Sequence, residues 1–124
     1  MAKFDDSLVA VTSRSFSTNQ FLVKKLKESY PNVSLNLTGK TLKENELVKF
    51  LANADKAIVG IEIIDKDILE QLPKLKLISK YGVGLNNLDL GECKKRNIQI
   101  KFQPGSNKQS VAEFTLLLML NSLR

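Results

Sequence analysis

The sequence predicts an α/β fold: a flavodoxin-like sheet of five parallel strands, in the order 2-1-3-4-5, with helices on both faces and a long apolar helix at the C-terminal end. Three observations support this fold class. Short apolar runs alternate five times with segments of helical period, and no repeat or low-complexity linker interrupts them. The strand runs look buried, as both faces of a parallel sheet require. Right-handed crossovers and the small size of the chain favour this strand order.

The first strand and the first helix follow from local pattern. Residues 8–11 form a short apolar run that is typical of a strand. Over residues 18–29, Leu22 and Leu26 recur at helical spacing, with Tyr30 next on the same face. The proline after this tyrosine ends the helix, because proline cannot continue helical backbone.

The middle of the chain predicts two further strands with a helix between them. Residues 33–37 alternate apolar and polar side chains, as a half-buried strand does. Residues 41–44, Thr-Leu-Lys-Glu, have the form of a capping box that opens a helix running to about Ala54. Residues 57–59 form a third, continuously apolar strand, which Gly60 ends.

The second half of the chain repeats the alternation. Asp65 is placed to cap a short helix that ends at Pro73, and residues 75–79 form the fourth strand. Asn87 starts the next helix, which has acidic side chains in its first turn and basic ones in its last, as the helix dipole favours. Residues 98–102 form the fifth strand.

Composition argues against several classes of function. The chain has 124 residues, a net charge of +6 and no histidine, so the commonest general base and metal ligand is missing and no metal site is expected. The lysines are scattered without an aromatic platform, which argues against nucleic-acid binding. The single cysteine, Cys93, suits a reducing compartment, and the longest apolar run, residues 114–120, is too short to cross a bilayer. We therefore expect one cytoplasmic domain with no signal peptide and no membrane segment.

A glycine-containing segment follows the fourth strand. Residues 79–87 read Ser-Lys-Tyr-Gly-Val-Gly-Leu-Asn-Asn. They do not form a dinucleotide-binding fingerprint, because the third glycine is missing and no acidic residue ends the next strand. Two glycines still let backbone approach a ligand, and a helix start offers free N–H groups to an anion. The segment therefore predicts either a carboxylate- or phosphate-binding loop or a tight turn that needs glycine only for its geometry.

The C-terminal stretch contains a second loop and the most apolar segment of the chain. Residues 110–113, Ser-Val-Ala-Glu, form a capping box. Asn107, just before it, either presents its amide to a ligand or bonds its own turn. Residues 114–120 are apolar nearly all round, and such a helix must be covered on every side. A second domain or a partner chain would cover it, unless its far face packs on the helices of the sheet.

Two blocks of this sequence resemble one protein family, in order and in spacing. Residues 75–78 and 82–89, Leu-Lys-Leu-Ile and Gly-Val-Gly-Leu-Asn-Asn-Leu-Asp, are similar to a signature of the D-isomer-specific 2-hydroxyacid dehydrogenases, phosphoglycerate dehydrogenase-like members included. Asn86 stands where that family usually has aspartate. Residues 104–120, Pro-x-x-Asn-x-x-Ser-Val-Ala-Glu-x-Thr-Leu-Leu-Leu-Met-Leu, resemble the second block. The resemblance covers the whole chain in layout.

The resemblance implies where the chain binds a substrate. In that family a flavodoxin-like domain holds a small 2-hydroxy or 2-oxo acid. The backbone amides of Val83 and Gly84 would take the carboxylate, and the side chain of Asn107 would orient the substrate. Val83 would also lie near the nicotinamide of the cofactor. The expected substrate-binding residues are Gly82, Val83, Gly84 and Asn107, and the expected pocket wall consists of Gly60, Ile61, Glu62 and Tyr81.

The resemblance also implies a division of the enzyme. Residues 1–109 would be the substrate-binding domain, and residues 110–124 would be a helix that crosses to a Rossmann cofactor domain, which this chain lacks. The catalytic arginine, glutamate and histidine of the family lie in the same absent part. NAD or NADP serves the full-length enzyme, and we expect neither to bind this chain tightly. No catalytic residue, and no dehydrogenase activity, is therefore expected of residues 1–124 alone.

One alternative remains open. The chain would then be a stand-alone module that binds a 2-oxo or 2-hydroxy acid and dimerises through the helix over residues 110–124. A receiver-type signalling domain is disfavoured, because residues 12–14, Thr-Ser-Arg, and residues 60–61, Gly-Ile, occupy the places where it needs acidic side chains. Cys93, mid-helix and without a histidine partner, is expected to be a packing residue.

Overall fold

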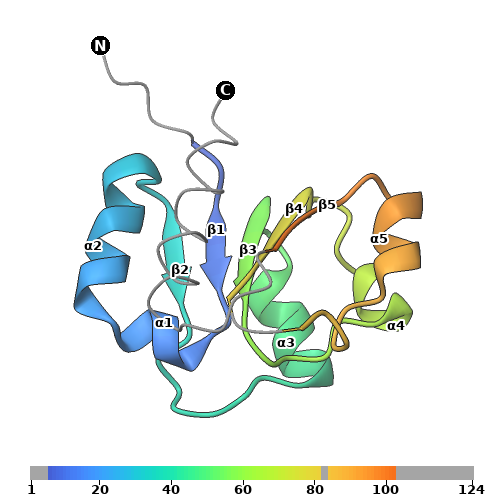
Figure 1. Cartoon of the computed structure of the whole chain (residues 1–124), viewed down its shortest axis with the longest axis horizontal. Helices are drawn as coiled ribbons and strands as arrows, with labels where there is room; N and C mark the ends of the chain where they lie inside the picture. The colour runs from blue at the N-terminus through green and yellow to red at the C-terminus, as the bar shows by residue number, and fades with distance from the viewer. Residues whose placement is uncertain (1–5, 82–83, 103–124) are drawn as a thin grey trace.

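The computed structural model describes residues 6–81 and 84–102. Within them, short strands pair in parallel to form one sheet (Figure 1). The strands are β1 (Val9–Val11), β2 (Val33–Leu35), β3 (Lys56–Val59), β4 (Leu77–Lys80) and β5 (Gln99–Lys101). Their order in the sheet is β2-β1-β3-β4-β5, and every neighbouring pair is parallel. The predicted parallel α/β sheet and its strand order are confirmed.

Helices cover both faces of this sheet. In the described residues they are α1 (Arg14–Thr18), α2 (Gln20–Ser29), α3 (Glu44–Leu51), α4 (Lys66–Leu69) and α5 (Leu90–Lys95). The first two pack on one face, where they share a cluster of buried side chains with β1. The other three pack on the opposite face, where α3 contacts α4 and α4 contacts α5. The expectation of helices on both faces is therefore confirmed.

The central strands send alternate side chains into two buried clusters, one on each face. In β1, Val9 and Val11 belong to the cluster under α1 and α2, whereas Ala10 belongs to the cluster under the other helices. Every residue of β1, β3 and β4 is buried, as the apolar runs predict for interior strands. The helices contribute Phe16, Leu22 and Leu26 to the first cluster and Leu47, Leu51, Ile68, Leu69 and Cys93 to the second.

The helix predicted over residues 18–29 is confirmed as α2, which begins at Gln20, and the short helix α1 before it was not predicted. The chain breaks at Asn19, which ends α1 and caps α2: its side-chain oxygen accepts from Leu22 N at 3.1 Å. Asparagine is among the most favourable N-cap residues, so α2 starts after Asn19 rather than at Thr18. The predicted apolar face is confirmed, since Leu22, Leu26 and Tyr30 are all buried.

The alternation predicted for residues 33–37 is wrong at its end. Leu37 is 69% exposed, whereas Asn36 is buried. The amide of Asn36 donates to Thr12 O at 2.9 Å and to Lys40 O at 3.0 Å. These bonds turn the chain away from the sheet after Leu35, so the leucine that follows leaves the core.

The capping box predicted at residues 41–44 is also wrong. The helix α3 begins at Glu44, and its N-cap residue, Lys43, makes no side-chain bond to it. Leu42 is buried, so the preceding segment packs into the core as a loop rather than winding into a first turn. Glu44 and Glu46 in the first turn favour the helix start through its dipole instead.

The elements of the second half are confirmed in place but differ in their boundaries. Asp65 caps α4 as predicted, and its carboxylate accepts from Ile68 N at 3.0 Å. The helix expected to start at Asn87 begins at Leu90, with Asp89 as its N-cap. Asn87 and Asp89 are both residue types that can cap a helix. Asp89 caps α5, whereas the side chain of Asn87 is bonded to Gly60 and Glu62.

Several predictions concern residues outside the described part of the chain. These are the loop containing Asn107, the long apolar helix over residues 110–124 and the boundary after residue 109. Among the described residues, no helix has the length and apolar character needed to cross a membrane.

The packing of α3 can be tested with Leu51→Ala. Leu51 is fully buried in the larger cluster, so truncation leaves a cavity, and we expect the free energy of unfolding to fall by about 2–5 kcal/mol. Leu37→Ala is the matched control: because that side chain is 69% exposed, its effect should stay within about 0.5 kcal/mol. Urea unfolding followed by circular dichroism measures both, and equal midpoints would contradict the packing described here.

Candidate functional site

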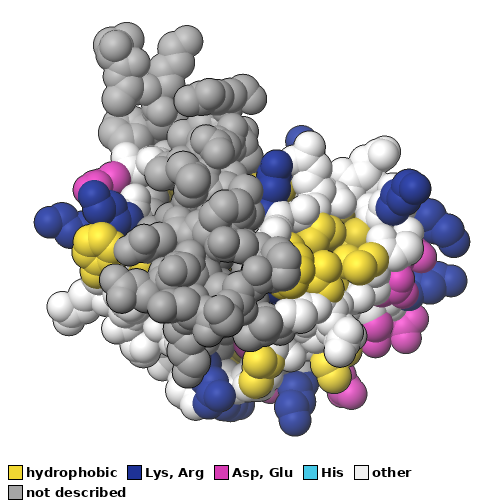
Figure 2. Space-filling view, in the orientation of Figure 1, with side chains coloured by type: hydrophobic (Ala, Val, Ile, Leu, Met, Phe, Trp, Pro, Cys, Tyr) yellow, Lys and Arg dark blue, Asp and Glu magenta, His cyan; other side chains and the backbone are white. Residues whose placement is uncertain are grey.

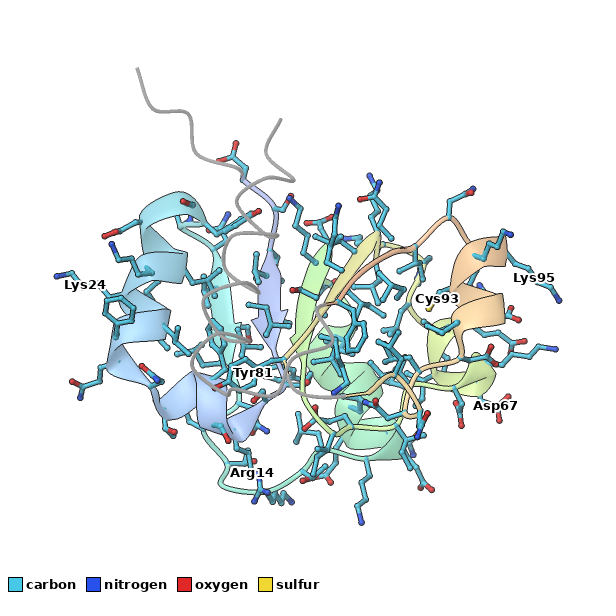
Figure 3. All side chains as sticks on the ribbon, viewed as in Figure 1. Arg14, Lys24, Asp67, Tyr81, Cys93 and Lys95 are labelled. Carbon is cyan, nitrogen blue, oxygen red and sulfur yellow. The ribbon has the colours of Figure 1, made fainter. Side chains whose placement is uncertain are left out.

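The carboxyl ends of the central strands meet at one edge of the sheet, where open α/β sheets bind their ligands. Tyr81, just beyond β4, donates its backbone N–H to Val59 O at 2.8 Å. Its ring packs edge-on against Phe16 of α1, with the ring centroids 5.3 Å apart. Figure 3 shows Tyr81 at the lower edge of the sheet, on the same side as Arg14, the first residue of α1. The loops after β1, β3 and β4 therefore lie together.

The loop after β3 contains one buried and one exposed member of the predicted pocket wall. Glu62 is 1% exposed, and its Oε1 atom accepts from Thr12 Oγ1 at 2.6 Å and from Gly60 N at 3.0 Å. Ile61 is 67% exposed. Glu62 therefore anchors this loop to the end of β1, while Ile61 is open to a ligand. The role of Thr12 was not predicted, although a hydroxyl directly after a buried strand is a usable signal.

Gly60 allows the loops after β1 and β3 to approach each other. A Cβ atom added at Gly60 would lie 3.2 Å from Ser13 Cβ and 3.5 Å from Glu62 Oε1. The first of these distances is tighter than ordinary carbon contacts in a close-packed interior, so a side chain here would push the two loops apart.

Asn87 ties the loop after β4 to the loop after β3. Its side-chain amide donates to Gly60 O at 3.0 Å and to Glu62 O at 2.7 Å, which uses both of its N–H donors. The backbone carbonyl of Asn87 accepts from Ile64 N at 2.8 Å, and Ile64 forms an isolated parallel bridge with Leu88. Asn87 was expected to start a helix, and its role between the two loops was not predicted.

Of the predicted substrate-binding residues, Gly84 lies within the described part of the chain. Gly82, Val83 and Asn107 lie outside the described residues. The φ angle of Gly84 is +83°, a conformation that favours glycine. A Cβ atom built there would meet nothing within 4 Å, so backbone geometry requires the glycine and crowding does not. This geometry fits a tight turn and also leaves open space beside the backbone.

Lys80 brings a buried amine to the same edge. It is the last residue of β4 and is 3% exposed. Burial lowers the pKa of its ammonium group below the usual 10.5, and the negative charge of Glu62 acts in the opposite direction. Burial also raises the pKa of the Tyr81 phenol, which therefore stays protonated at neutral pH. Ser79 Oγ, on the same strand, has no hydrogen-bond partner among the described residues.

A cavity of about 510 Å³ opens between the loop after β2 and the loop after β3. Its walls combine apolar side chains with charged and hydroxyl groups. They are formed by Thr41, Leu42, Lys43, Glu44, Ile61, Ile63, Asp65 and Ile68. Of the four predicted wall residues, Ile61 lines this cavity.

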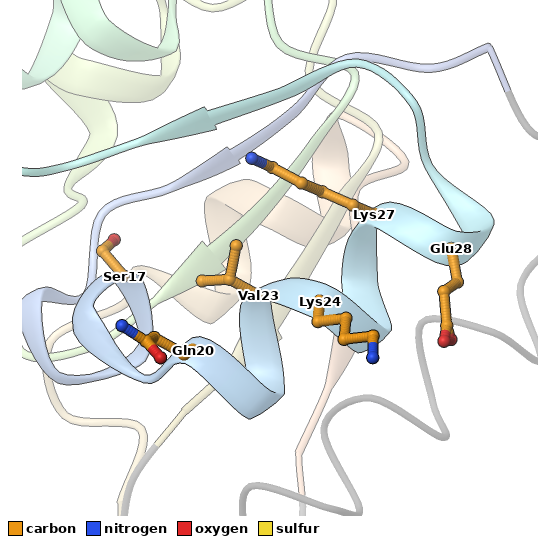
Figure 4. Close-up of a pocket in the computed structure, with 6 residues that line it drawn as sticks. All are labelled: Ser17, Gln20, Val23, Lys24, Lys27 and Glu28. Atoms are coloured by element: carbon orange, nitrogen blue, oxygen red, sulfur yellow. The ribbon is translucent and has the colours of Figure 1, made fainter.

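A second cavity, of about 530 Å³, lies beside α1 and α2 (Figure 4). It is lined by Ser17, Gln20, Val23, Lys24, Lys27 and Glu28. Figure 4 shows Lys24 and Glu28 pointing away from the sheet. None of the lining residues belongs to the loops after β3 or β4, so this cavity is not part of the candidate site.

The remaining charged and nucleophilic groups form no further site in the described residues. Figure 2 shows Lys and Arg side chains spread around the outline of one face, with Asp and Glu between them on one side. No group of three His, Cys, Asp or Glu side chains in the described ranges could hold a metal ion. Burial, with smaller effects from Asp89 and Glu92, raises the pKa of the Cys93 thiol, which makes it a poor nucleophile.

The clamp formed by Asn87 can be tested by truncation. Asn87→Ala removes the donor to two carbonyls of the loop after β3, and we expect the free energy of unfolding to fall by about 1–3 kcal/mol. Asn86→Ala is the matched control, because Asn86 is the exposed neighbour of the same residue type. If chemical denaturation gave both variants the same midpoint, the two hydrogen bonds of the Asn87 side chain would not contribute to stability.

The buried amine of Lys80 predicts a dependence of stability on pH. Because its pKa is lowered in the folded state, the unfolded chain binds more protons as the pH approaches 10.5 from below. The contribution of Lys80 to the free energy of unfolding therefore rises with pH in that window. We expect the stability difference between the wild type and Lys80→Met to rise from neutral pH towards 10.5, and the exposed control Lys76→Met to show no such trend. Parallel curves for the wild type and Lys80→Met would contradict the burial of the ammonium group.

Comparisons with known proteins place the chain in a family. The family model for the catalytic domain of D-isomer specific 2-hydroxyacid dehydrogenases matches residues 9–117. A hydroxypyruvate reductase from Thermotoga maritima is 34% identical over 91 residues, which are 73% of this chain and 30% of that protein. A glyoxylate reductase from Thermofilum pendens is 42% identical over 76 residues, 60% of this chain and 22% of that protein.

A solved structure shows the same fold. The NAD+-bound 3-phosphoglycerate dehydrogenase of Entamoeba histolytica superposes with a TM-score of 0.64 at 22% identity, covering 77% of this chain and 32% of that one. The chain thus spans about a third or less of the length of these relatives. The matched region, residues 9–117, includes every strand of the sheet and the loop around Gly84. On these findings the chain belongs to the family of D-isomer-specific 2-hydroxyacid dehydrogenases, whose catalytic domain it matches.

Proposed function

We propose that this chain is the substrate-binding domain of an NAD-dependent D-2-hydroxyacid dehydrogenase and binds the carboxylate of a small 2-hydroxy or 2-oxo acid. The loop Gly82-Val83-Gly84 takes the carboxylate through the backbone N–H groups of Val83 and Gly84, and the side chain of Asn107 orients the substrate. The observation that supports this most directly is Gly84, a glycine with positive φ beside open space at the carboxyl edge of the sheet. Ile61 offers an exposed apolar contact for the substrate side chain.

The affinity of such a site follows from the number of its donors. Hydrogen bonds to a charged acceptor contribute about 1.5–3 kcal/mol each before the cost of ordering the ligand. Two amides and one side-chain amide therefore leave a net binding energy of about 4 kcal/mol, which is a Kd of about 1 mM.

Cofactor binding does not fit the described residues and belongs to a further domain. The third glycine of a dinucleotide fingerprint is replaced by Asn87, whose side chain is engaged with Gly60 and Glu62. We therefore assign residues 1–109 to substrate binding and residues 110–124 to the helix that leads to the cofactor domain. NAD would supply hydride chemistry there, with Val83 near its nicotinamide.

Substrate positioning alone does not give turnover. A dehydrogenase also needs a group that moves the hydroxyl proton, most often a histidine, and this sequence has none. We expect no NADH formation from residues 1–124 with a broad panel of 2-hydroxy acids. Measurable turnover by the pure chain would contradict the assignment of acid, base and cofactor to a further domain.

Titration with oxalate tests the proposed ligand. Oxalate is a planar dianion that resembles a 2-oxo acid, and acetate is the control that lacks its second oxygen pair. In ¹⁵N-resolved NMR we expect oxalate to shift the amide of Gly84 and its neighbours with a Kd of about 1 mM. Gly84→Ala, which is strained at φ +83°, should weaken this binding at least about tenfold. Shifts confined to other parts of the chain would overturn the proposed site.

The mass of the chain in solution separates the stand-alone module from this proposal. A stable dimer that binds oxalate tightly would favour a module that pairs through residues 110–124. A weakly binding monomer supports the proposed domain of a larger enzyme.

A further inference from the structure

The buried carboxylate of Glu62 closes a turn on itself. It accepts from the backbone N–H of Gly60, two residues earlier, at 3.0 Å. Thr12 Oγ1 donates to the same oxygen at 2.6 Å. The Thr12 hydroxyl also lies 3.3 Å from Ile58 O, but the shorter bond runs to the charged acceptor, as expected for a single hydroxyl proton. The turn over residues 60–62 is thus held by the carboxylate of Glu62 and by Thr12, the residue after β1.

The closed turn sets the direction of two carbonyl groups. Gly60 O and Glu62 O both accept from the side-chain amide of Asn87, at 3.0 Å and 2.7 Å. One NH₂ group reaches both acceptors only when the two carbonyls converge on it. The conformation that Glu62 imposes on its own backbone is therefore the conformation that Asn87 requires.

The backbone on either side of the glycine loop is bonded to the same region. Before the loop, Tyr81 N bonds Val59 O at 2.8 Å. After it, Asn87 O accepts from Ile64 N at 2.8 Å, and Leu88 N bonds Leu85 O at 3.0 Å within the turn. Residues 59–64 thus hold both ends of the segment that contains Gly84.

We infer that Glu62 is a positioning residue for the carboxylate-binding loop: through Thr12 and Gly60 it fixes the turn after β3, and through Asn87 that turn orients the backbone at Gly84. The ligand part of this inference rests on the proposed function. Glu62 does not touch the ligand. A negative charge beside an anion site weakens anion binding by itself, so the benefit comes from hydrogen-bond geometry.

Three variants separate geometry from charge. Glu62→Ala removes the acceptor, Thr12→Val removes the hydroxyl donor with little change in shape, and Glu62→Gln keeps an acceptor oxygen without the charge. Glu70→Gln is the matched control, since Glu70 is exposed at the end of α4. Oxalate affinity and the ¹⁵N amide shifts of residues 84–88 are measured on the folded 124-residue chain, well below each unfolding midpoint.

We expect Glu62→Ala and Thr12→Val to move the amide signals of residues 84–88 and to raise the Kd for oxalate about tenfold. Glu62→Gln should restore both to within about threefold of the wild type, and Glu70→Gln should change neither. If Glu62→Ala does not fold, Thr12→Val decides the matter. Variants that lower only the unfolding midpoint, with unchanged signals and Kd, would overturn the inference.

A wild-type chain that binds no oxalate would reject the proposed function instead. The positioning role is then decided by the amide signals alone. Movement of residues 84–88 in Thr12→Val supports the role, and unmoved signals overturn it.

Discussion

The structure at the carboxyl edge depends on how the buried turn after β3 satisfies its backbone polar groups. A buried N–H or C=O group without a hydrogen-bond partner costs about 1–3 kcal/mol of stability. The backbone groups of a turn in this position therefore need partners. Gly60 N uses the carboxylate of Glu62, and two carbonyls of the turn use the amide of Asn87. Thr12, after β1, bonds to the same carboxylate, so the loops after β1 and β4, the two neighbours of β3, are coupled through this turn.

This coupling explains why charge is tolerated at a buried edge. Glu62 and Lys80 are almost fully buried, and each would be costly without compensation. The carboxylate receives two hydrogen bonds, and its charge counteracts part of the effect of burial on the pKa of Lys80. The carboxylate that holds the turn therefore also favours the charged form of Lys80. Glu62, which the family resemblance places in the pocket wall, is buried in the structure and bonds to Thr12 and Gly60.

The sequence determines the sheet more directly than the site, for a physical reason. Strand order follows from apolar runs and right-handed crossovers, which are local patterns plus a general rule, and the buried face of α2 follows from spacing. The end of β2 and the role of Asn87 depend on hydrogen bonds to residues far away in the chain. Asn36 reaches Thr12, and Asn87 reaches Gly60, 24 and 27 positions apart. Spacing within a segment carries no information about such partners.

The glycine loop departs from a dinucleotide fingerprint at Asn87, which also bonds to residues far away in the chain. In that fingerprint the third glycine lets a helix start close to its strand. Here Asn87 occupies this position, and the helix begins three residues later, at Leu90. The residues between them are free to form the bridge of Leu88 with Ile64 and to face the turn after β3. In the described part of this segment, Gly84 supplies the positive φ and the side chain of Asn87 attaches the chain to the turn after β3.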